Sequence, residues 1–247
     1  MDLNSAVALI TGASGGIGAA LAEELVKAGA RVVLLARRAA KLAEVVDRIG
    51  SEHAVAVVGS VTEAGDLQRA VRVAIERFGG LDILVNNAGI GLYGRVENLP
   101  ADLLLETWKT NLLGAVLAIQ AALPALRRSS RALIVNISSV TSITASPSLA
   151  GYAMTKAALN LLSETLRKEL RQDGIRVLTI FPGYLGNEFA DHAYYADDSP
   201  MVQRLRTTRP ARTSQDAARD IVRAILLDLD EWRYEEELAR SQQASSA

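Results

Sequence analysis

Two side chains that can move a proton stand four residues apart, at Tyr152 and Lys156. On an α-helix this spacing places both on one face, where they can interact. A free phenol has a pKa of about 10 and is a slow proton carrier near neutral pH. We expect the Lys156 ammonium, together with a second positive charge in a partly dry site, to lower the pKa of Tyr152 by roughly two to three units, so that Tyr152 serves as general acid and base. The pair alone is a weak signal, because helices often bury a tyrosine beside a lysine whose ammonium reaches solvent.

A glycine-rich segment near the N-terminus is typical of a phosphate-binding turn. An apolar run at 6–10 ends there, and helical spacing begins at 19–28. The segment consists of Thr11, Gly12, Ala13, Ser14, Gly15, Gly16, Ile17 and Gly18. Where a strand leads into a helix, missing Cβ atoms let backbone amides approach a pyrophosphate at the positive end of the helix. The alternative is a tight turn whose small residues serve only helix packing.

The rest of the chain alternates between short apolar runs and segments of helical spacing. Strands are expected at 31–35, 54–58, 81–85, 132–137 and 175–181, and helices at 39–49, 62–78, 100–126, 151–172 and 213–229, with threonine caps at 62 and 213. This pattern predicts an α/β fold, a Rossmann-type doubly wound parallel sheet with helices on both faces, in one domain spanning 1–247. Residues 184–212 are polar but rich in tyrosine, and we expect them to form a mobile flap over the substrate.

Composition excludes several classes of function. The chain has 247 residues, a formal net charge of -1 and no block of basic residues, so neither nucleic acid nor a membrane surface is an expected partner. It has no cysteine and two histidines, which argues against disulfides and against a metal site. The start lacks the basic region of a signal peptide, and the apolar run at 115–126 is interrupted by Gln120 and Pro124. We expect a soluble cytoplasmic protein with a small-molecule partner.

The residues after the second expected strand bear on the choice of cofactor. A dinucleotide site has an acidic residue there for the ribose diol of NAD(H), or an arginine for the 2′-phosphate of NADP(H). This chain has Ala36, Arg37 and Arg38. Because no carboxylate repels a phosphate and a guanidinium can bind one, we expect Arg37 to bind it and NADP(H) to be preferred over NAD(H). The alternative is that both arginines are solvated charges at the start of a helix.

Several motifs in register resemble the short-chain dehydrogenase/reductase family. They are Thr11-Gly12-x-x-x-Gly16-x-Gly18, Asn86-Asn87-Ala88-Gly89, Asn111, Ser139, Tyr152-x-x-x-Lys156 and Pro182-Gly183. The resemblance runs from about residue 6 to residue 183. It implies an oxidoreductase that interconverts a ketone or aldehyde and an alcohol by hydride transfer, assembled as a homodimer or homotetramer on the fourth and fifth helices. The arginines after the second strand indicate NADP(H) as its cofactor.

The resemblance also implies residue roles. Tyr152 would be the general acid and base, Ser139 rather than Ser138 would hold the substrate oxygen, Lys156 would also bind the nicotinamide ribose, and Asn111 would hold a water that relays protons to Lys156. The expected cofactor contacts are Gly12, Ser14, Gly15, Gly16, Ile17, Gly18, Arg37, Ser60, Val61, Asn87, Ala88, Gly89, Tyr152, Lys156, Pro182, Gly183, Leu185 and Asn187.

Three departures from the family pattern stand out. Ser60 replaces a frequent aspartate near the adenine, and Asn187 replaces a threonine near the nicotinamide. Residues 232–234 are a poor candidate for the family's last strand. The residues expected to border the pocket favour an apolar or aromatic carbonyl compound as substrate. They are Gly91, Leu92, Tyr93, residues 143–149, Tyr184, Tyr194 and Tyr195. The alternative is that these tyrosines only anchor a loop.

Two other functions stay open at this point. A non-catalytic NADP(H)-binding regulatory or scaffold protein of the same fold commonly lacks a member of the catalytic set, and none is missing here. A sugar epimerase or dehydratase generally has a larger C-terminal substrate region than this chain and a different glycine spacing.

Overall fold

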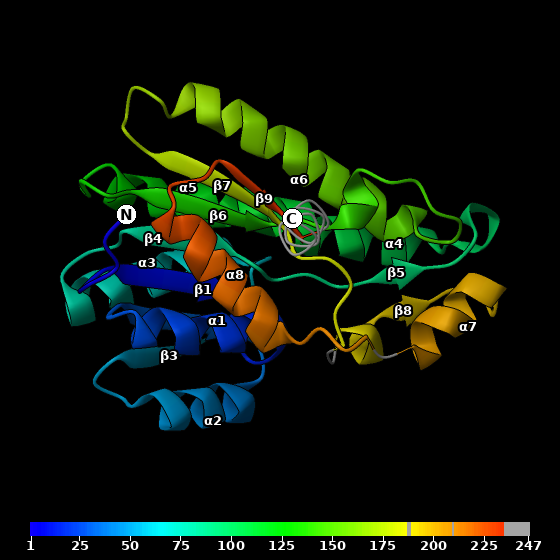
Figure 1. The fold of residues 1–247 in the computed structure, drawn as a ribbon, viewed down its shortest axis with the longest axis horizontal. Coiled ribbons are helices and arrows are strands. Elements are labelled where there is room, and N and C mark those ends of the chain that lie inside the picture. The colour runs from blue at the N-terminus through cyan, green and yellow to red at the C-terminus, as the bar shows by residue number, and fades with distance from the viewer. Residues whose placement is uncertain (187–188, 209, 235–247) are drawn as a thin grey trace, which may run out of the picture.

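A parallel sheet of seven strands lies at the centre of the computed structural model, which describes residues 1–186, 189–208 and 210–234 (Figure 1). The sheet order is β3-β2-β1-β4-β6-β7-β9. Its strands are β1 (Val7–Thr11), β2 (Arg31–Ala36), β3 (Ala54–Val58), β4 (Ile83–Asn86), β6 (Leu133–Ile137), β7 (Arg176–Phe181) and β9 (Glu231–Arg233). The chain order reverses between β1 and β4, which is where doubly wound sheets bind their ligands. The predicted Rossmann-type fold is confirmed.

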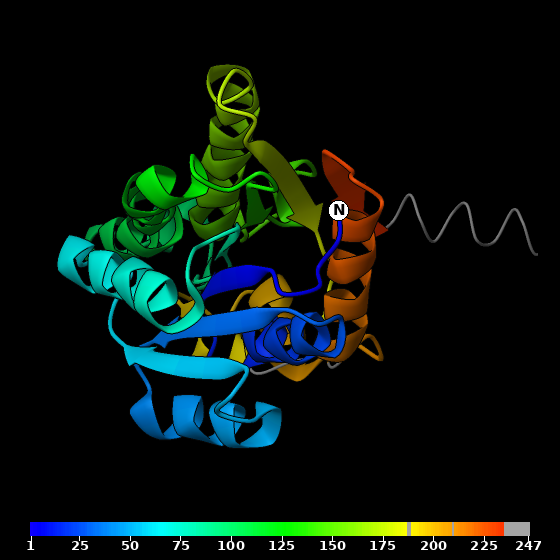
Figure 2. The same ribbon diagram turned by 90° about the vertical axis from the view of Figure 1, so that its left-hand side faces the viewer.

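Helices cover both faces of the sheet (Figure 2). They are α1 (Gly16–Lys27), α2 (Ala39–Ile49), α3 (Ala64–Phe78), α4 (Ala101–Trp108), α5 (Gly114–Leu126), α6 (Ala150–Glu169), α7 (Pro200–Thr207) and α8 (Ser214–Leu226), with short turns η1 (Val96–Asn98), η2 (Lys109–Leu113), η3 (Val140–Ser142) and η4 (Ala190–His192). Strand β1 shows the alternation: Ala8 and Ile10 pack towards α1, α2 and α8, whereas Val7 and Leu9 pack towards α3, α5 and α6.

The expected single helix over 100–126 is interrupted. It runs as α4, the π-helical turn η2 and α5, and the turn contains Asn111. By length and composition alone the stretch Ala101–Leu126 could cross a membrane. That is weak evidence, since 44% of the apolar window is buried in the fold and Ile119 and Leu126 belong to the core. We therefore assign it as a core helix.

The two predicted threonine caps have different outcomes. Helix α8 begins with a capping box, in which the Thr213 side chain accepts from the Asp216 backbone amide and the Asp216 side chain accepts in return. The predicted cap at Thr62 is wrong, because α3 begins after Glu63. Thr62 instead belongs to the preceding loop, where its backbone amide donates to the Ser60 hydroxyl.

The prediction that 232–234 would make a poor last strand is also wrong. Strand β9 pairs in parallel with β7, so that Trp232 lies opposite Ile180 and is buried. Arg167 of α6 supports this edge by donating to the Asp230 carbonyl at 2.8 Å and to the Thr179 hydroxyl at 2.6 Å. A strand of three residues is too short for its periodicity to be detected, and tertiary contacts define it instead.

The described part of the predicted flap carries structure of its own. It contains η4, β8 (Tyr194–Tyr195) and α7, and β8 pairs in parallel with β5 (Leu92–Tyr93). In Figure 1 these elements extend beyond the carboxyl ends of the main strands, at the right of the view. Val202 of α7 is fully buried in a cluster with Tyr93, Leu149 and Tyr152. The segment thus packs against Tyr152 of α6, beyond the carboxyl ends of the main strands.

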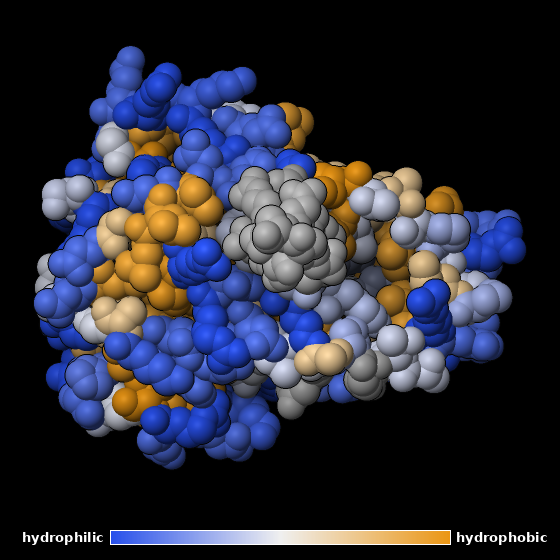
Figure 3. Space-filling view, viewed as in Figure 1, coloured by the Kyte–Doolittle hydropathy of each residue, from blue (hydrophilic) through white to orange (hydrophobic). Residues whose placement is uncertain are grey.

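The face seen in Figure 3 is largely hydrophilic, and apolar colour gathers over the carboxyl end of α8. Leu226 and Leu227 are exposed there. The apolar surface at this end of α8 is therefore exposed and is not part of the core.

Candidate active site

The glycine turn lies at the point where the strand order reverses. Gly12 has a φ of +67°, and a Cβ added there would come within 2.8 Å of the Ala88 Cα. A Cβ at Gly18 would lie 2.6 Å from Nδ2 of the Asn87 side chain. Larger residues are therefore excluded where the loop after β1 meets the loop after β4. Ser14 and Gly15 lead directly into α1, which begins with Gly16 and Ile17 and whose N-cap, Gly15, provides no side-chain hydrogen bond.

Hydrogen bonds fix these two loops to each other. The Thr11 hydroxyl accepts from the backbone amides of Asn87 and Ala88 at 3.0 and 3.1 Å and donates to the Val85 carbonyl. The Asn87 side chain donates to the Thr11 carbonyl at 2.9 Å. Asn86 donates to the Asn136 side chain at 2.8 Å and so joins β4 to β6, as expected from the sequence. A rigid cradle with amides at a helix N-terminus fits a pyrophosphate.

Among the residues that follow β2, Arg38 makes the contact with the glycine turn. Its Nε donates to the Ser14 hydroxyl at 3.2 Å, and its Nη1 lies 3.2 Å from Nε2 of His192 in η4. Arg37 is exposed, and its charge acts on Tyr194. The sequence reasoning assigned the phosphate contact to Arg37, and the position of Arg38 beside the glycine turn makes it a second candidate.

Ser60 and Val61 follow β3. The Ser60 backbone amide donates to the Asp66 carboxylate at 2.8 Å, and its hydroxyl is hydrogen-bonded to that of Thr62 at 2.8 Å. Val61 is buried, and a Cβ at Gly114 of α5 would lie 2.7 Å from its Cγ2. The Ser60 backbone carbonyl also accepts from the Glu63 backbone amide at 3.2 Å, so the backbone of Val61 remains as the candidate for a nucleotide contact.

Tyr152, Lys156 and Ser139 come together at the carboxyl end of β6. The Lys156 Nζ lies 5.8 Å from the centroid of the Tyr152 ring and donates to the Ile137 carbonyl at 2.8 Å. Ser139 is hydrogen-bonded to Tyr152, and its hydroxyl also accepts from the Thr141 backbone amide at 3.2 Å. Ser138 instead bonds the Asn160 side chain of α6. The structure therefore separates the two serines as the sequence reasoning did.

The electrostatics of the pair differ from the expectation. Burial raises the pKa of the Tyr152 phenol, and the hydrogen bond with Ser139 opposes that rise. Burial also lowers the pKa of Lys156 to about 8. The predicted lowering of the Tyr152 pKa is thus wrong for the protein without cofactor. The physical reason is desolvation, since Tyr93 and Phe189 place their ring centroids 6.0 and 5.6 Å from that of Tyr152.

Asn111 is buried in the π turn and connects three elements. Its side chain accepts from the Ile90 backbone amide at 2.8 Å and donates to the Ile90 carbonyl at 2.9 Å and to the Thr155 hydroxyl at 3.0 Å. A Cβ at Gly89 would lie 3.3 Å from the Asn111 oxygen and 3.6 Å from the Lys156 Nζ. Asn111, Gly89 and Lys156 therefore converge on one point.

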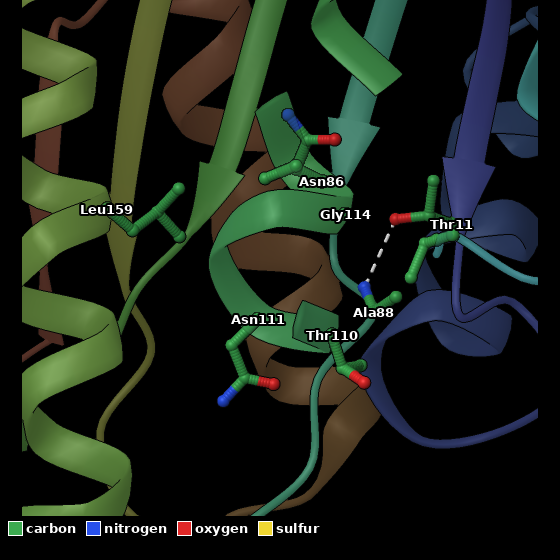
Figure 4. Close-up of a pocket in the computed structure, with 9 residues that line it drawn as sticks. Thr11, Asn86, Ala88, Thr110, Asn111, Gly114 and Leu159 are labelled. Carbon is green, nitrogen blue, oxygen red and sulfur yellow. Dashed lines mark hydrogen bonds between the residues drawn. The ribbon is translucent and has the colours of Figure 1, made fainter. Parts of the chain in front are cut away.

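A small cavity of about 10 Å³ lies behind this point, between the ends of β1 and β4 and the π turn (Figure 4). Its lining residues are Thr11, Val61, Asn86, Ala88, Thr110, Asn111, Gly114, Ala115 and Leu159. Within the described residues, the Asn86 side-chain oxygen is the buried side-chain polar atom that lacks a hydrogen-bond partner. The cavity is far too small for a dinucleotide or an organic substrate. It is a gap among the residues that hold the site in place, and it is not a binding pocket.

The loop after β7 forms the remaining edge. Gly183 has a φ of +75°, and a Cβ there would lie 2.6 Å from the Tyr234 ring. Pro182 and Leu185 stand in the same loop, and Asn187 lies outside the described residues. The described part of the chain shows no group of three or more His, Cys, Asp or Glu side chains that could hold a metal ion.

Sequence reasoning placed Phe189 in the flap without assigning it to Tyr152, and it did not single out Arg212 beside Pro182. Arg212 donates to the Pro182 carbonyl at 3.1 Å. Neither residue belongs to a motif, and each reaches the site through a tertiary contact.

Comparison with known proteins points to one family. The family model described as short chain dehydrogenase matches residues 6–196. An 11-beta-hydroxysteroid dehydrogenase A of Sesamum indicum is 38% identical over 236 residues, which cover 91% of this chain and 67% of that protein. An uncharacterized oxidoreductase of Staphylococcus aureus is 34% identical over 181 residues, which cover 73% of this chain and 78% of that protein.

Solved structures agree with this result. A short-chain dehydrogenase from Streptomyces avermitilis superposes with a TM-score of 0.84 at 30% identity, covering 98% of this chain and 93% of the other. A short-chain dehydrogenase/reductase from Burkholderia phymatum in complex with NAD gives a TM-score of 0.85 at 25% identity, with the same coverage.

Proposed function

Because the chain belongs to the short-chain dehydrogenase family, we propose that it interconverts a ketone or aldehyde and an alcohol with NADP(H), and that Tyr152 is the general acid and base. The observation that carries the proposal is the meeting of Ser139, Tyr152 and Lys156 beside the glycine cradle. A screen of ketones, aldehydes and alcohols with NADPH or NADP⁺, followed by nicotinamide absorbance, tests it. A purified protein that binds the cofactor and turns over no compound of these classes would favour the non-catalytic alternative.

The side chains divide the work of carbonyl reduction. When bound, the nicotinamide ring supplies the hydride. The Ser139 hydroxyl donates to the carbonyl oxygen and polarises it, while the Tyr152 phenol gives that oxygen its proton. With a pKa of about 8, Lys156 is mainly an ammonium at neutral pH. Its charge stabilises the phenolate that remains on Tyr152. Asn111 holds the loop after β4 against α6 and so keeps Lys156 in place.

The preference for NADP(H) rests on the arginines after β2. Arg37 and Arg38 stand where a carboxylate would otherwise select NAD(H), and Arg38 reaches Ser14 in the glycine turn. A guanidinium binds phosphate through several charge-assisted hydrogen bonds. Since the Burkholderia phymatum structure contains NAD, both cofactors have to be measured.

We expect the wild-type kcat/KM for NADPH to exceed that for NADH by about tenfold or more. Arg37→Ala and Arg38→Ala should each lower kcat/KM for NADPH roughly 10- to 100-fold, as expected for losing a charged hydrogen bond. The values for NADH should change little, because NADH has no 2′-phosphate. Arg128→Ala, an exposed arginine beyond α5, is the matched control. A tenfold preference of the wild type for NADH would overturn the assignment.

The substrate that we propose is an apolar or aromatic carbonyl compound. Tyr93 and Phe189 pack against Tyr152, and Tyr195 packs against Tyr93 with ring centroids 5.7 Å apart. Aromatic walls favour a bulky apolar ligand. The name of the Sesamum indicum relative supports polycyclic alcohols as the first compounds to test.

Phe189→Ala should shift the pH dependence of alcohol oxidation. Oxidation needs the phenolate of Tyr152, so its rate rises with pH through the Tyr152 pKa. Burial raises that pKa, and removing the Phe189 ring admits water, so the rise should move to lower pH. Phe189→Leu keeps an apolar cover and is the control. Equal midpoints for the two variants would show that Phe189 does not determine the solvation of Tyr152.

We also propose a homodimer or homotetramer. Exposed apolar side chains on α4, η2 and α6 support contact between copies of the chain: Leu105, Trp108, Leu113, Met154 and Leu161. Light scattering across a dilution series tests this.

A further inference from the structure

One arginine connects the two ends of the flap. The chain leaves the sheet at Pro182, after β7, and returns to α8 after Arg212. The Arg212 Nε donates to the Pro182 carbonyl at 3.1 Å, and the Arg212 carbonyl accepts from the Gly186 backbone amide at 2.9 Å. In Figure 1 the yellow segment that leaves β7 runs down to the orange segment that enters α8, at the right of that helix. The segment is therefore a loop closed at its base by Arg212.

The guanidinium is itself held from several sides. It forms an ion pair with Asp220 of α8, and its Cζ lies 3.8 Å from the ring centroid of Tyr234 and 5.8 Å from that of Trp232. Only 12% of the side chain is exposed. A planar cation stacked on an aromatic ring and paired with a carboxylate has little freedom to rotate. Arg212 is thus fixed relative to both α8 and the chain that follows β9.

These contacts reach the groups that would face the nicotinamide. Pro182 and Gly183 follow β7, and the Tyr234 ring that stacks on Arg212 also limits the space at Gly183. On its far side the loop carries Phe189, which covers Tyr152. A shift of Arg212 would therefore move the loop at Pro182 and Gly183 together with the aromatic cover of Tyr152.

We propose that Arg212 is a positioning residue for the reaction, which orients the Pro182–Gly183 backbone towards the nicotinamide end of the cofactor by fixing the base of the flap. The inference rests on the proposed function, since it assigns a role within that same site. Arg212 touches neither substrate nor the reacting atoms, and it acts through Pro182 and Gly186.

The test compares binding at the two ends of the cofactor. Arg212→Gln alone would leave the Asp220 carboxylate without its ion-pair partner, so it is combined with Asp220→Asn. The single variant Asp220→Asn is the control. We expect the double variant to weaken NADPH binding and to lower kcat, each roughly 10- to 100-fold, as for the loss of a charged hydrogen bond. Its affinity for adenosine 2′,5′-bisphosphate, which reaches only the adenosine end, should stay within about threefold of that of the wild type because no contact there has changed.

The possible outcomes separate the two proposals. If the double variant lost affinity equally for NADPH and for adenosine 2′,5′-bisphosphate and had a lower melting temperature, Arg212 would only stabilise the fold. Unchanged NADPH binding and kcat in the double variant would overturn the positioning role while leaving the proposed function intact. If the wild type binds neither NADPH nor NADH, the proposed function itself fails. If it prefers NADH, the same comparison is made with NADH and AMP, and the expected pattern is the same.

Discussion

Tyr152→Phe is expected to reduce kcat for carbonyl reduction by roughly 10² to 10⁴-fold, the usual contribution of a positioned proton donor. The substitution removes one oxygen and keeps the ring. The aromatic contacts with Tyr93 and Phe189 should therefore persist. Single-turnover measurements with excess enzyme would report the chemical step directly.

Cofactor binding separates loss of chemistry from loss of structure. The Kd for NADPH, measured by dihydronicotinamide fluorescence, should stay within about threefold of the wild-type value, because the pyrophosphate cradle is unchanged. Tyr93→Phe is the matched control, since it removes a buried phenolic oxygen from a neighbouring ring 6.0 Å away. It should lower kcat by less than about tenfold. A Tyr152→Phe variant with near wild-type turnover would remove Tyr152 from the mechanism.

The same residue shows what sequence reasoning could predict and what it could not. Helical periodicity places Tyr152 and Lys156 on one face of α6, because that depends on local geometry. The burial of Tyr152 depends on Tyr93 and Phe189, which lie far away in the sequence. Periodicity contains no information on such contacts. The predicted direction of the Tyr152 pKa was wrong because it counted the charge of Lys156 and could not count the desolvation.

A similar distinction applies to the fold. Six strands were predictable because short apolar runs alternate with segments of helical spacing. The glycine turn was predictable from its glycine spacing after the first strand, and the structure gives the reason for that spacing, since Gly12 and Gly18 have no room for a Cβ. Strand β9 was missed because three residues give no period, and β7 defines it through pairing. The π turn at Asn111 was missed for a related reason. Its stabilising contacts run to Ile90 and Thr155, outside the helix in which a periodicity would be sought.

Lys156→Met should have opposite effects on activity and on stability. Removing the ammonium leaves the phenolate of Tyr152 without its cation, so kcat/KM should fall roughly 10² to 10⁴-fold. Burial lowers the Lys156 pKa from 10.5 to about 8, which corresponds to about 3 kcal/mol of cost for the charged form in the folded protein at neutral pH. The lost hydrogen bond to the Ile137 carbonyl offsets about 1 to 3 kcal/mol of that relief. The variant should thus be inactive and at least as stable as the wild type at pH 7.

The pH dependence of unfolding gives the clearest signature of this cost. Between the folded pKa of about 8 and the ordinary value of 10.5, the unfolded chain binds more protons at position 156 than the folded protein does. The wild-type free energy of unfolding should therefore rise with pH across this range, relative to that of Lys156→Met. Below pH 8 the difference between the free energies of unfolding of the two proteins should be constant. Lys168→Met, an exposed lysine on the same helix, should follow the wild type. If the two unfolding curves kept a constant separation from pH 7 to 10.5, Lys156 would be solvated in the folded protein, and the desolvated ammonium could not be what tunes Tyr152.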